Sequence, residues 1–369
     1  MQKKSLILLV FVFQCLNSFC QTLDYSFFLA GHTYGKPSVL SVGLHPPFLD
    51  IFPYLMSRPE IEFGALLGDI AAFHPNAESW DNAEEELDTL GIPVHFVPGN
   101  HDMYDEAEYY SRYEPFYSFK HKSDLIIVLH PYFTGWNIAG EQWDFLEQTL
   151  QTQASSSRNI FIFFHQLLWY SESNAYKEYE PNSLDGRDAS INFWSEFIPL
   201  LLSYPNEFVL AAGDIGATNK PKQFMYDKWN NIQFIATGMG NSVDDNIVIA
   251  NVYTSGVMDF EIICLEDPAL FCLGNLEDYA ITYIPFTSQP ELSITTYPNP
   301  AKDNIWIENP HSEDLHVRVF SLTGIIYETR TIPKWSKTKV ATKDFPRGML
   351  QIQVVSEQGQ HFEQKVVLN

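Results

Sequence analysis

Basic residues and cysteines are scarce in this sequence, and each shortage excludes a class of protein. The 369 residues contain 22 Lys and Arg against 46 Asp and Glu, which gives a formal net charge of −24. Proteins that bind nucleic acid need clustered basic side chains for the phosphate backbone, so we do not expect nucleic acid as a partner. The chain has only four cysteines, too few for a fold held together by a framework of disulfides.

Long apolar runs are also missing, except for a short one at the N-terminus. Lys3 and Lys4 precede an apolar stretch, residues 5–13, that is too short to span a bilayer. Ser18 and Cys20 then supply smallish residues before a cleavage site. This pattern predicts a signal peptide over residues 1–20 and a mature chain without a transmembrane segment; the alternative is a buried first strand. At 45% hydrophobic residues the rest can bury a large core, so a mainly disordered chain is excluded.

Two cysteines, Cys264 and Cys272, remain once the signal peptide is removed. Export makes disulfides possible. The sequence leaves two alternatives open, a bridge across this short loop or two free thiols.

The charge balance changes sharply towards the C-terminus. Residues 21–289 carry 37 acidic and 11 basic side chains, whereas residues 290–369 carry nine of each. Such a step predicts a domain boundary. We therefore expect one domain over residues 21–266, a linker over residues 267–289 and a second domain over residues 290–369.

The C-terminal segment contains short runs of β-forming residues separated by turn dipeptides such as Asn309-Pro310 and Arg347-Gly348. This pattern predicts a small all-β sandwich. The segment resembles the type A C-terminal sorting domain of type IX secretion. The resemblance is carried by the stretch from Tyr297 to Asp303, the Phe320–Gly324 turn, Arg347–Met349 and the closing Lys365–Leu368. It implies that the type IX machinery is a partner and that the protein is secreted or lies on the outer-membrane surface. An ordinary Ig-like accessory module is the alternative.

Before this segment, apolar strand-like runs alternate with helical patterns, which is typical of an α/β fold. Four of the strands are followed directly by polar residues that can bind a metal. These residues are Asp69, Asn100 with His101 and Asp102, His165, and Asp214. Open α/β sheets place their ligand sites beyond the carboxyl ends of the strands, so we expect these side chains to meet.

Carboxylate, amide and imidazole groups in this combination suit a pair of metal ions that hold a hydroxide for hydrolysis. Residues 25–264 resemble the calcineurin-like metallophosphoesterases. Gly68-Asp69 and the Gly99–Asp102 stretch match two motifs of that family, and His165 fits its single histidine. The resemblance implies a four-layer α/β/β/α sandwich.

The first and last motifs of the family are altered in this chain. Where the family has Asp-x-His, the sequence has His32-Thr33-Tyr34, and where it has Gly-His-x-His, the sequence has the stretch from Gly213 to Gly216. Gly216 offers no side chain to a metal.

The resemblance then implies one metal site held by four ligands and a second that is incomplete. The first set is Asp69, Asn100, His165 and Asp214. The second site keeps Asp69 and His32, with Tyr34 as a phenolate only if a strong Lewis acid such as ferric iron is bound. Manganese, zinc or iron would be the metal ion.

We expect a secreted metal-dependent phosphoesterase that hydrolyses a small phosphomonoester or phosphodiester through a metal-bound hydroxide. His101 would act as general acid or orient the phosphate, and Asp102 would fix its imidazole. The alternative is a cell-surface binding protein whose phosphoesterase fold has lost turnover. Structural roles also remain open for single candidates, such as a core histidine at His165 or a turn residue at Asp214.

Overall fold

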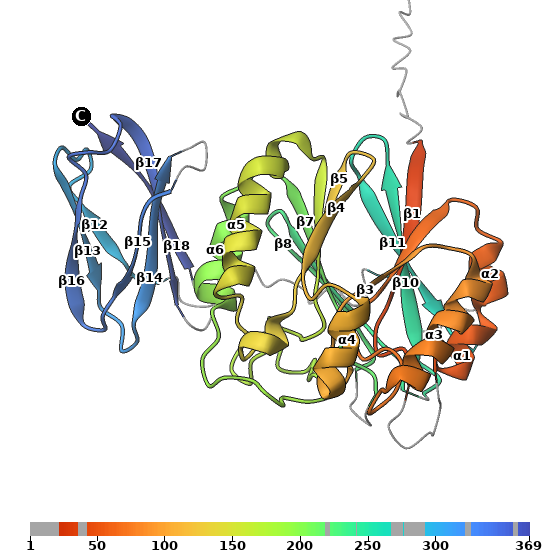
Figure 1. Cartoon of the computed structure of the whole chain (residues 1–369). Helices are drawn as coiled ribbons and strands as arrows, with labels where there is room; N and C mark the ends of the chain where they lie inside the picture. Colours follow the sequence, from red (N-terminus) through yellow and green to blue (C-terminus); the bar gives the residue numbers. More distant parts are fainter. Residues whose placement is uncertain are drawn as a thin grey trace, which may run out of the picture.

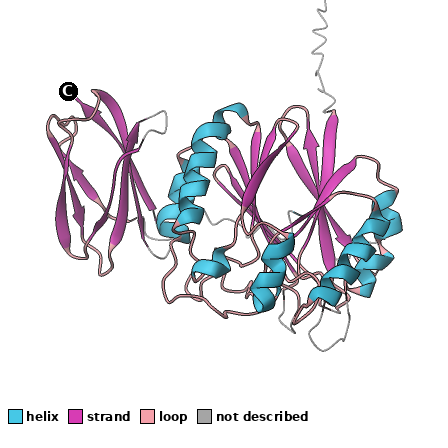
Figure 2. Cartoon of the chain, in the orientation of Figure 1, coloured by secondary structure: helices cyan, strands magenta, loops and turns pink. Residues whose placement is uncertain are grey.

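The computed structural model describes residues 22–35, 43–217, 222–240, 242–266, 276, 292–321, 326–356 and 361–369. The predicted signal peptide and nearly all of the predicted linker lie outside these residues. The described chain forms an α/β part with two sheets and a C-terminal part built of strands (Figures 1 and 2).

The first sheet has five strands in the order β11-β10-β1-β2-β3. Strands β1, β2 and β3 pair in parallel, and β10 and β11 are antiparallel additions at one side. The strands are β1 (Leu23–Ala30), β2 (Ile61–Leu66), β3 (Val94–Phe96), β10 (Asn246–Tyr253) and β11 (Met258–Cys264). Helices α1 (Pro46–Asp50), α2 (Phe52–Met56) and α3 (Ala77–Leu90) cover its outer face (Figure 1).

The second sheet has six strands in the order β4-β5-β6-β7-β9-β8. They are β4 (Tyr117–His121), β5 (Asp124–Val128), β6 (Asn159–Phe163), β7 (Glu207–Ala212), β8 (Phe224–Trp229) and β9 (Ile232–Thr237). The four central strands run parallel, and α5 (Glu141–Gln153), η4 (Phe193–Phe197) and α6 (Ile198–Leu202) belong to this half. The remaining helical segments are η1 (Asp102–Asp105), α4 (Glu106–Arg112), η2 (Pro131–Thr134) and η3 (Ala154–Ser156).

Three buried clusters explain why the layers stack. One fills the space between the two sheets, where the ring of Phe27 stacks on Phe63 with centroids 4.7 Å apart and meets the edge of Phe161 at 5.0 Å. The other two lie under the helices on either outer face. Central strands buried on both faces read as continuous apolar runs, as they do here. The expected four-layer α/β/β/α sandwich is confirmed.

The C-terminal part is a β-sandwich of two sheets around its own buried core. One sheet has the order β12-β13-β16 and the other the order β15-β14-β17-β18. The strands are β12 (Thr295–Tyr297), β13 (Asn304–Asn309), β14 (Leu315–Ser321), β15 (Ile326–Ile332), β16 (Ser336–Ala341), β17 (Gly348–Ser356) and β18 (His361–Leu368). The expectation of a small all-β sandwich is confirmed.

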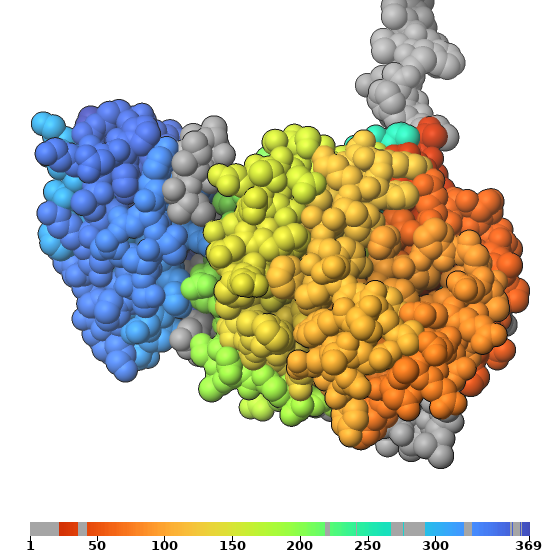
Figure 3. Space-filling view, viewed as in Figure 1, coloured from red at the N-terminus to blue at the C-terminus, as the bar shows by residue number. Residues whose placement is uncertain are grey.

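The sandwich lies beside the α/β part (Figures 1 and 3). Strands β17 and β14 both contact η4. Residues alternate between the two faces of a strand, so Val317 and Val319 face the sandwich core while Arg318 and Phe320 face outwards. Both outward side chains are nevertheless buried, and Nη2 of Arg318 donates a hydrogen bond of 3.0 Å to the carbonyl oxygen of Glu196 in η4. Burial lowers the pKa of Arg318 to about 10.

Two further observations bear on the expectation of export. In the described ranges no helix has both the length and the apolar character needed to cross a membrane. Cys264, at the end of β11, is disulfide-bonded. Cys272 lies outside the described residues.

Candidate metal centre

The loops that follow β1, β2, β3, β6 and β7 approach each other at one edge of the two sheets, and glycines permit this approach. A Cβ atom on Gly68 would lie 2.5 Å from Nδ1 of His165, and one on Gly99 would lie 2.3 Å from Oδ1 of Asp69. Both contacts are too short for any other residue. The glycines of the two matched motifs are thus required by packing around Asp69.

The backbone around the site is held in an uncommon conformation. Asp69 has a φ of 56° and His32 a φ of 57°. A left-handed conformation costs a non-glycine residue about 1–3 kcal/mol when the surroundings enforce it, and such residues cluster at functional sites. In this conformation the side chains of the two residues face each other, with 3.4 Å between Oδ2 of Asp69 and Nε2 of His32.

The carboxylate of Asp69 lies at the centre of the cluster and is almost fully buried. Its Oδ2 is 3.2 Å from Nε2 of His165, 3.4 Å from Nε2 of His32 and 3.9 Å from Nε2 of His101. Its Oδ1 accepts a hydrogen bond of 2.9 Å from the backbone N–H of His101. Burial opposes ionisation of Asp69, but the three imidazoles outweigh it and hold its pKa below the usual range. Asp69 therefore remains a carboxylate.

His165 links Asp69 to Asp214. Its Nδ1 lies 2.7 Å from the carbonyl oxygen of Leu67, while its Nε2 lies 3.9 Å from Oδ1 of Asp214. Burial opposes protonation of His165, but the charges of Asp69 and Asp214 outweigh it and raise its pKa to about 9. A carbonyl group that holds Nδ1 and leaves Nε2 facing carboxylates is the arrangement found for histidines that bind metals.

His32 and Tyr34 lie together on the loop after β1, with ring centroids 4.4 Å apart. Burial lowers the pKa of His32 to about 4, so its imidazole is neutral. Its Nδ1 has no hydrogen-bond partner among the described residues. Burial raises the pKa of Tyr34 well above its usual value, so the protein alone does not favour a phenolate there.

Asp102 has a different place from the one expected. We expected it to fix the imidazole of His101, but its two carboxylate oxygens accept hydrogen bonds of 2.8 Å from the backbone N–H groups of Asp69, Ile70 and Gly99. It therefore ties the loop after β2 to the loop after β3. The imidazole of His101 is oriented instead by the carbonyl oxygen of Phe73, 2.9 Å from its Nδ1.

The remaining expected ligand, Asn100, is half-buried in the turn between Gly99 and His101. The structure thus brings Asp69, His32, His101, His165 and Asp214 into one cluster and places Asn100 beside it.

The cluster has the donors of a metal site without a closed geometry. Within the described ranges, no three His, Cys, Asp or Glu side chains are arranged so that they could hold an ion as they stand. Instead, the three imidazole nitrogens lie around a single atom, Oδ2 of Asp69. The chemistry of the donors nevertheless fits a transition-metal ion. They are carboxylates and imidazoles, and a buried nitrogen of His32 lacks a partner among the described residues.

Two residues near this cluster were not singled out from the sequence. His130 lies two residues beyond the end of β5 and is 2% exposed, and neither of its ring nitrogens has a partner in the described part of the chain. Burial, and secondarily the charge of His165, lower its pKa to about 4. Gln166 is fully buried, and both its amide atoms also lack described partners. Each is a polar residue a short distance beyond an apolar strand, as His165 is.

Comparisons with family models match two separate segments of the chain. Residues 41–196 match the model described as calcineurin-like phosphoesterase. Residues 295–369 match the model described as secretion system C-terminal sorting domain. No curated protein matches the sequence.

Several solved structures are similar at low sequence identity. Purple acid phosphatase PPD1 from yellow lupin (Lupinus luteus) is 13% identical with a TM-score of 0.43, over 85% of this chain and 54% of that one. A putative 5'-nucleotidase from Staphylococcus aureus is 12% identical with a TM-score of 0.39, over 64% and 53%. A predicted phosphoesterase from Streptococcus pneumoniae is 10% identical with a TM-score of 0.30, over 66% and 91%. The chain thus spans about half the length of the lupin and staphylococcal proteins.

Proposed function

We propose that this chain is a metal-dependent phosphoesterase of the calcineurin-like family, whose model matches residues 41–196. Residues 295–369 match the secretion system C-terminal sorting domain. The sorting domain marks the protein for type IX secretion to the cell surface or beyond it. The proposed substrate is a small phosphomonoester or phosphodiester.

The observation that carries this proposal is the buried carboxylate of Asp69, faced by imidazoles from three other loops. Asp69, His165, Asp214 and Asn100 would hold one metal ion, and Asp69 and His32 would contribute to a second. Manganese, zinc or iron in such a site supplies a Lewis acid for the phosphoryl oxygen and lowers the pKa of a bound water.

The protein's own groups have separate tasks in this proposal. His101 lies at the mouth of the cluster with its side chain 21% exposed, and the Phe73 carbonyl holds Nδ1 so that Nε2 faces Asp69. It can donate a proton to the leaving oxygen of the ester. Asp102 keeps the two central loops in register through its three backbone hydrogen bonds. Asp102 would therefore affect catalysis only indirectly, by positioning these two loops.

A second candidate function is a surface binding protein that has lost turnover. The altered last motif favours it, because Gly216 offers no side chain where the family has a histidine.

Metal content and turnover, measured on the same preparation of the mature chain, test the two functions. We expect bound metal by elemental analysis and hydrolysis of p-nitrophenyl phosphate or its bis-ester. Asp69→Asn should lose both, whereas His101→Gln should retain metal and lose about 100-fold or more in turnover, as expected for a general acid. Asp81→Asn, an exposed carboxylate of α3, is the matched control and should change neither. Bound metal with no turnover of either ester would favour the binding protein.

The domain boundaries are part of the same proposal. We propose that residues 21–266 form the catalytic unit, residues 267–289 a linker and residues 290–369 the sorting unit. Limited proteolysis should cleave first within residues 267–289; a first cut inside either unit would refute these boundaries.

A further inference from the structure

A large cavity lies at the opposite edge of the second sheet from the candidate metal centre. Its volume is about 1310 Å³. Asn159 begins β6 and Glu207 begins β7, and both line this cavity, whereas His165 and Asp214 follow the other ends of the same strands. The cavity is therefore separate from the proposed catalytic cluster.

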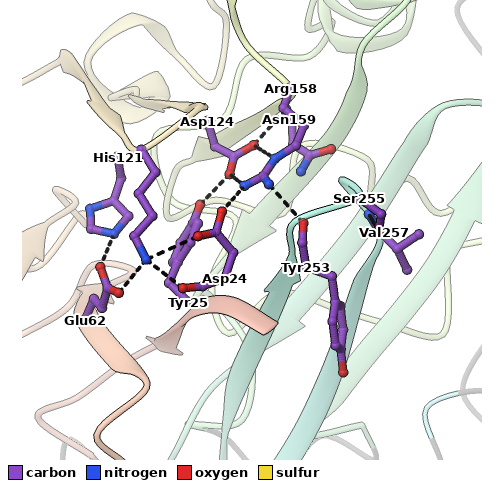
Figure 4. Close-up of polar contacts among 11 residues, drawn as sticks. Asp24, Tyr25, Glu62, His121, Asp124, Arg158, Asn159, Tyr253, Ser255 and Val257 are labelled. Atoms are coloured by element: carbon purple, nitrogen blue, oxygen red, sulfur yellow. Dashed lines mark hydrogen bonds and ion pairs between the residues drawn. The ribbon is translucent and has the colours of Figure 1, made fainter. Parts of the chain in front are cut away.

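The wall of the cavity is anchored by the buried carboxylate of Asp124 (Figure 4). It accepts hydrogen bonds of 2.9 Å from the hydroxyl of Tyr25 and 2.9 Å from the backbone N–H of Asn159, and it pairs with Arg158 at 2.5 Å. Arg158 also lies 3.0 Å from Asp24 and donates to the carbonyl oxygen of Tyr253. The guanidinium is thus fully engaged, and its charge is balanced by two carboxylates.

The side chain of Asn159 is the unusual feature of this wall. It is only 2% exposed and lines the cavity, yet its Nδ2 has no hydrogen-bond partner among the described residues. Its backbone is fixed by Asp124, so the amide is held in place (Figure 4). A buried amide donor without a partner is costly unless water or a ligand accepts from it.

The described lining of the cavity has no unpaired positive charge. Besides the neutralised Arg158, the lining has Lys228, which pairs with Glu207 at 3.3 Å at the exposed rim, and one exposed acid, Glu147. An anionic ligand would find no unpaired cation among these residues. The rest of the lining is made mainly of amides, hydroxyls and two tyrosine rings, Tyr204 and Tyr226.

We propose that this cavity binds a neutral oligosaccharide. Amide groups can donate to and accept from sugar hydroxyls, and tyrosine rings offer an apolar face with a polar edge. The volume exceeds the range of about 300–1,000 Å³ typical of small-molecule sites, which suits several sugar units in preference to one. This proposal is independent of the proposed phosphoesterase activity.

Isothermal titration calorimetry on the full mature chain tests it, with cellotetraose, maltotetraose and mannotetraose as neutral probes and tetragalacturonate as the acidic one. We expect saturable binding of at least one neutral probe. Asn159→Leu, which keeps the shape and removes the amide, should weaken binding about tenfold, as should Tyr226→Ala. Gln151→Ala, on the exposed end of α5 beside the cavity, provides a third variant that does not disturb the core. It should weaken binding measurably.

Lys228→Met is the matched control. A neutral sugar should bind it as tightly as the unchanged protein, within about twofold, because the exposed Lys228–Glu207 pair contributes little. Hydrolysis of p-nitrophenyl phosphate should be the same in all four variants. Absence of saturable binding by every neutral probe, binding of tetragalacturonate that depends on Lys228, or binding unchanged in all three lining variants would each overturn the proposal.

Discussion

Gly68 and Asp69 show how single residues set the geometry of the candidate site. Both have positive φ values, 85° and 56°, and a side chain on Gly68 would collide with the ring of His165. The strained turn presents the Asp69 carboxylate to three imidazoles. Any ligand of this site therefore depends on the strained conformation of this turn.

Gly68→Ala should accordingly disable the site. The new Cβ atom would meet the His165 ring, so we expect a loss of about 2–4 kcal/mol in the free energy of unfolding and a loss of bound metal. Gly91→Ala is the matched control, because Gly91 also has a positive φ, 67°, but open space around it. It should cost about 1 kcal/mol and leave metal content unchanged. Thermal unfolding and elemental analysis measure both; equal effects in the two variants would contradict the packing argument.

Sequence reasoning found the residues of this cluster that belong to spaced motifs and missed those that do not. Asp69 and His101 were identifiable because Gly68-Asp69 and the Gly99–Asp102 stretch stand in a recognisable order. The bonding of Asp102 could not be read from the sequence, because it depends on how two loops meet. His130 was passed over for a similar reason: its lack of partners becomes visible only when the fold buries it.

At the scale of elements, the α/β half depends on polar contacts that tie its two sheets together at the edge away from the site. Asp124 of β5 accepts from Tyr25 of β1 and from Arg158 beside β6 (Figure 4). The apolar runs of β5 and β6 predicted buried strands, but the sequence could not show that a carboxylate at the start of β5 would be fully buried. Its burial is possible because four donors satisfy it.

Asp124→Asn should destabilise the protein strongly. It removes a buried charge that compensates Arg158, and breaking a buried pair in this way costs about 3–5 kcal/mol. Asp24 also faces Arg158, so we expect the lower end of that range. Chemical denaturation measures the change, with Glu207→Gln at the exposed Lys228 pair as a control expected to change stability by less than about 1 kcal/mol. A loss below 1 kcal/mol for Asp124→Asn would show that the pair is not a structural link.

Strand β3 should make stability depend on pH through His95. Burial, and secondarily the nearby His121, lower the pKa of His95 from 6.5 to about 4, and its ring stacks on Phe119 with centroids 3.9 Å apart. The unfolded chain therefore binds a proton between pH 6.5 and pH 4 that the folded chain does not, so stability is lost as the pH falls through this window.

His95→Phe retains the stacked ring and removes the titration. The difference in unfolding free energy between the unchanged protein and the variant should be constant above pH 7 and should shift in favour of the variant towards pH 4. Urea unfolding at a series of pH values measures this difference. A difference that does not vary with pH would mean that His95 ionises as readily in the folded protein as in the unfolded chain.

At the scale of the whole molecule, the step in charge near residue 290 predicted two units but not their contact. Alternation along β14 assigns Arg318 to the outer face of the sandwich, where the sequence alone would place it in solvent. The structure buries it against η4 instead, with a single hydrogen bond to the Glu196 carbonyl; Nε and Nη1 have no partner among the described residues. This contact holds the sorting domain in place. It does so at a considerable cost in desolvation free energy, because the buried guanidinium has only one hydrogen bond within the described ranges.

Arg318→Ala should therefore release the sorting domain from the α/β part. We expect amide hydrogen exchange in η4, residues 193–197, to accelerate about tenfold, which corresponds to about 1.4 kcal/mol of lost docking energy, and the radius of gyration from X-ray scattering to rise. Arg318→Met keeps much of the packing and removes the poorly bonded nitrogens, so it should retain the docked form. Arg330→Ala, on the neighbouring strand and 38% exposed, is the control and should leave both readouts unchanged. Exchange in η4 that is equally slow in all three variants would show that Arg318 does not hold the two parts together.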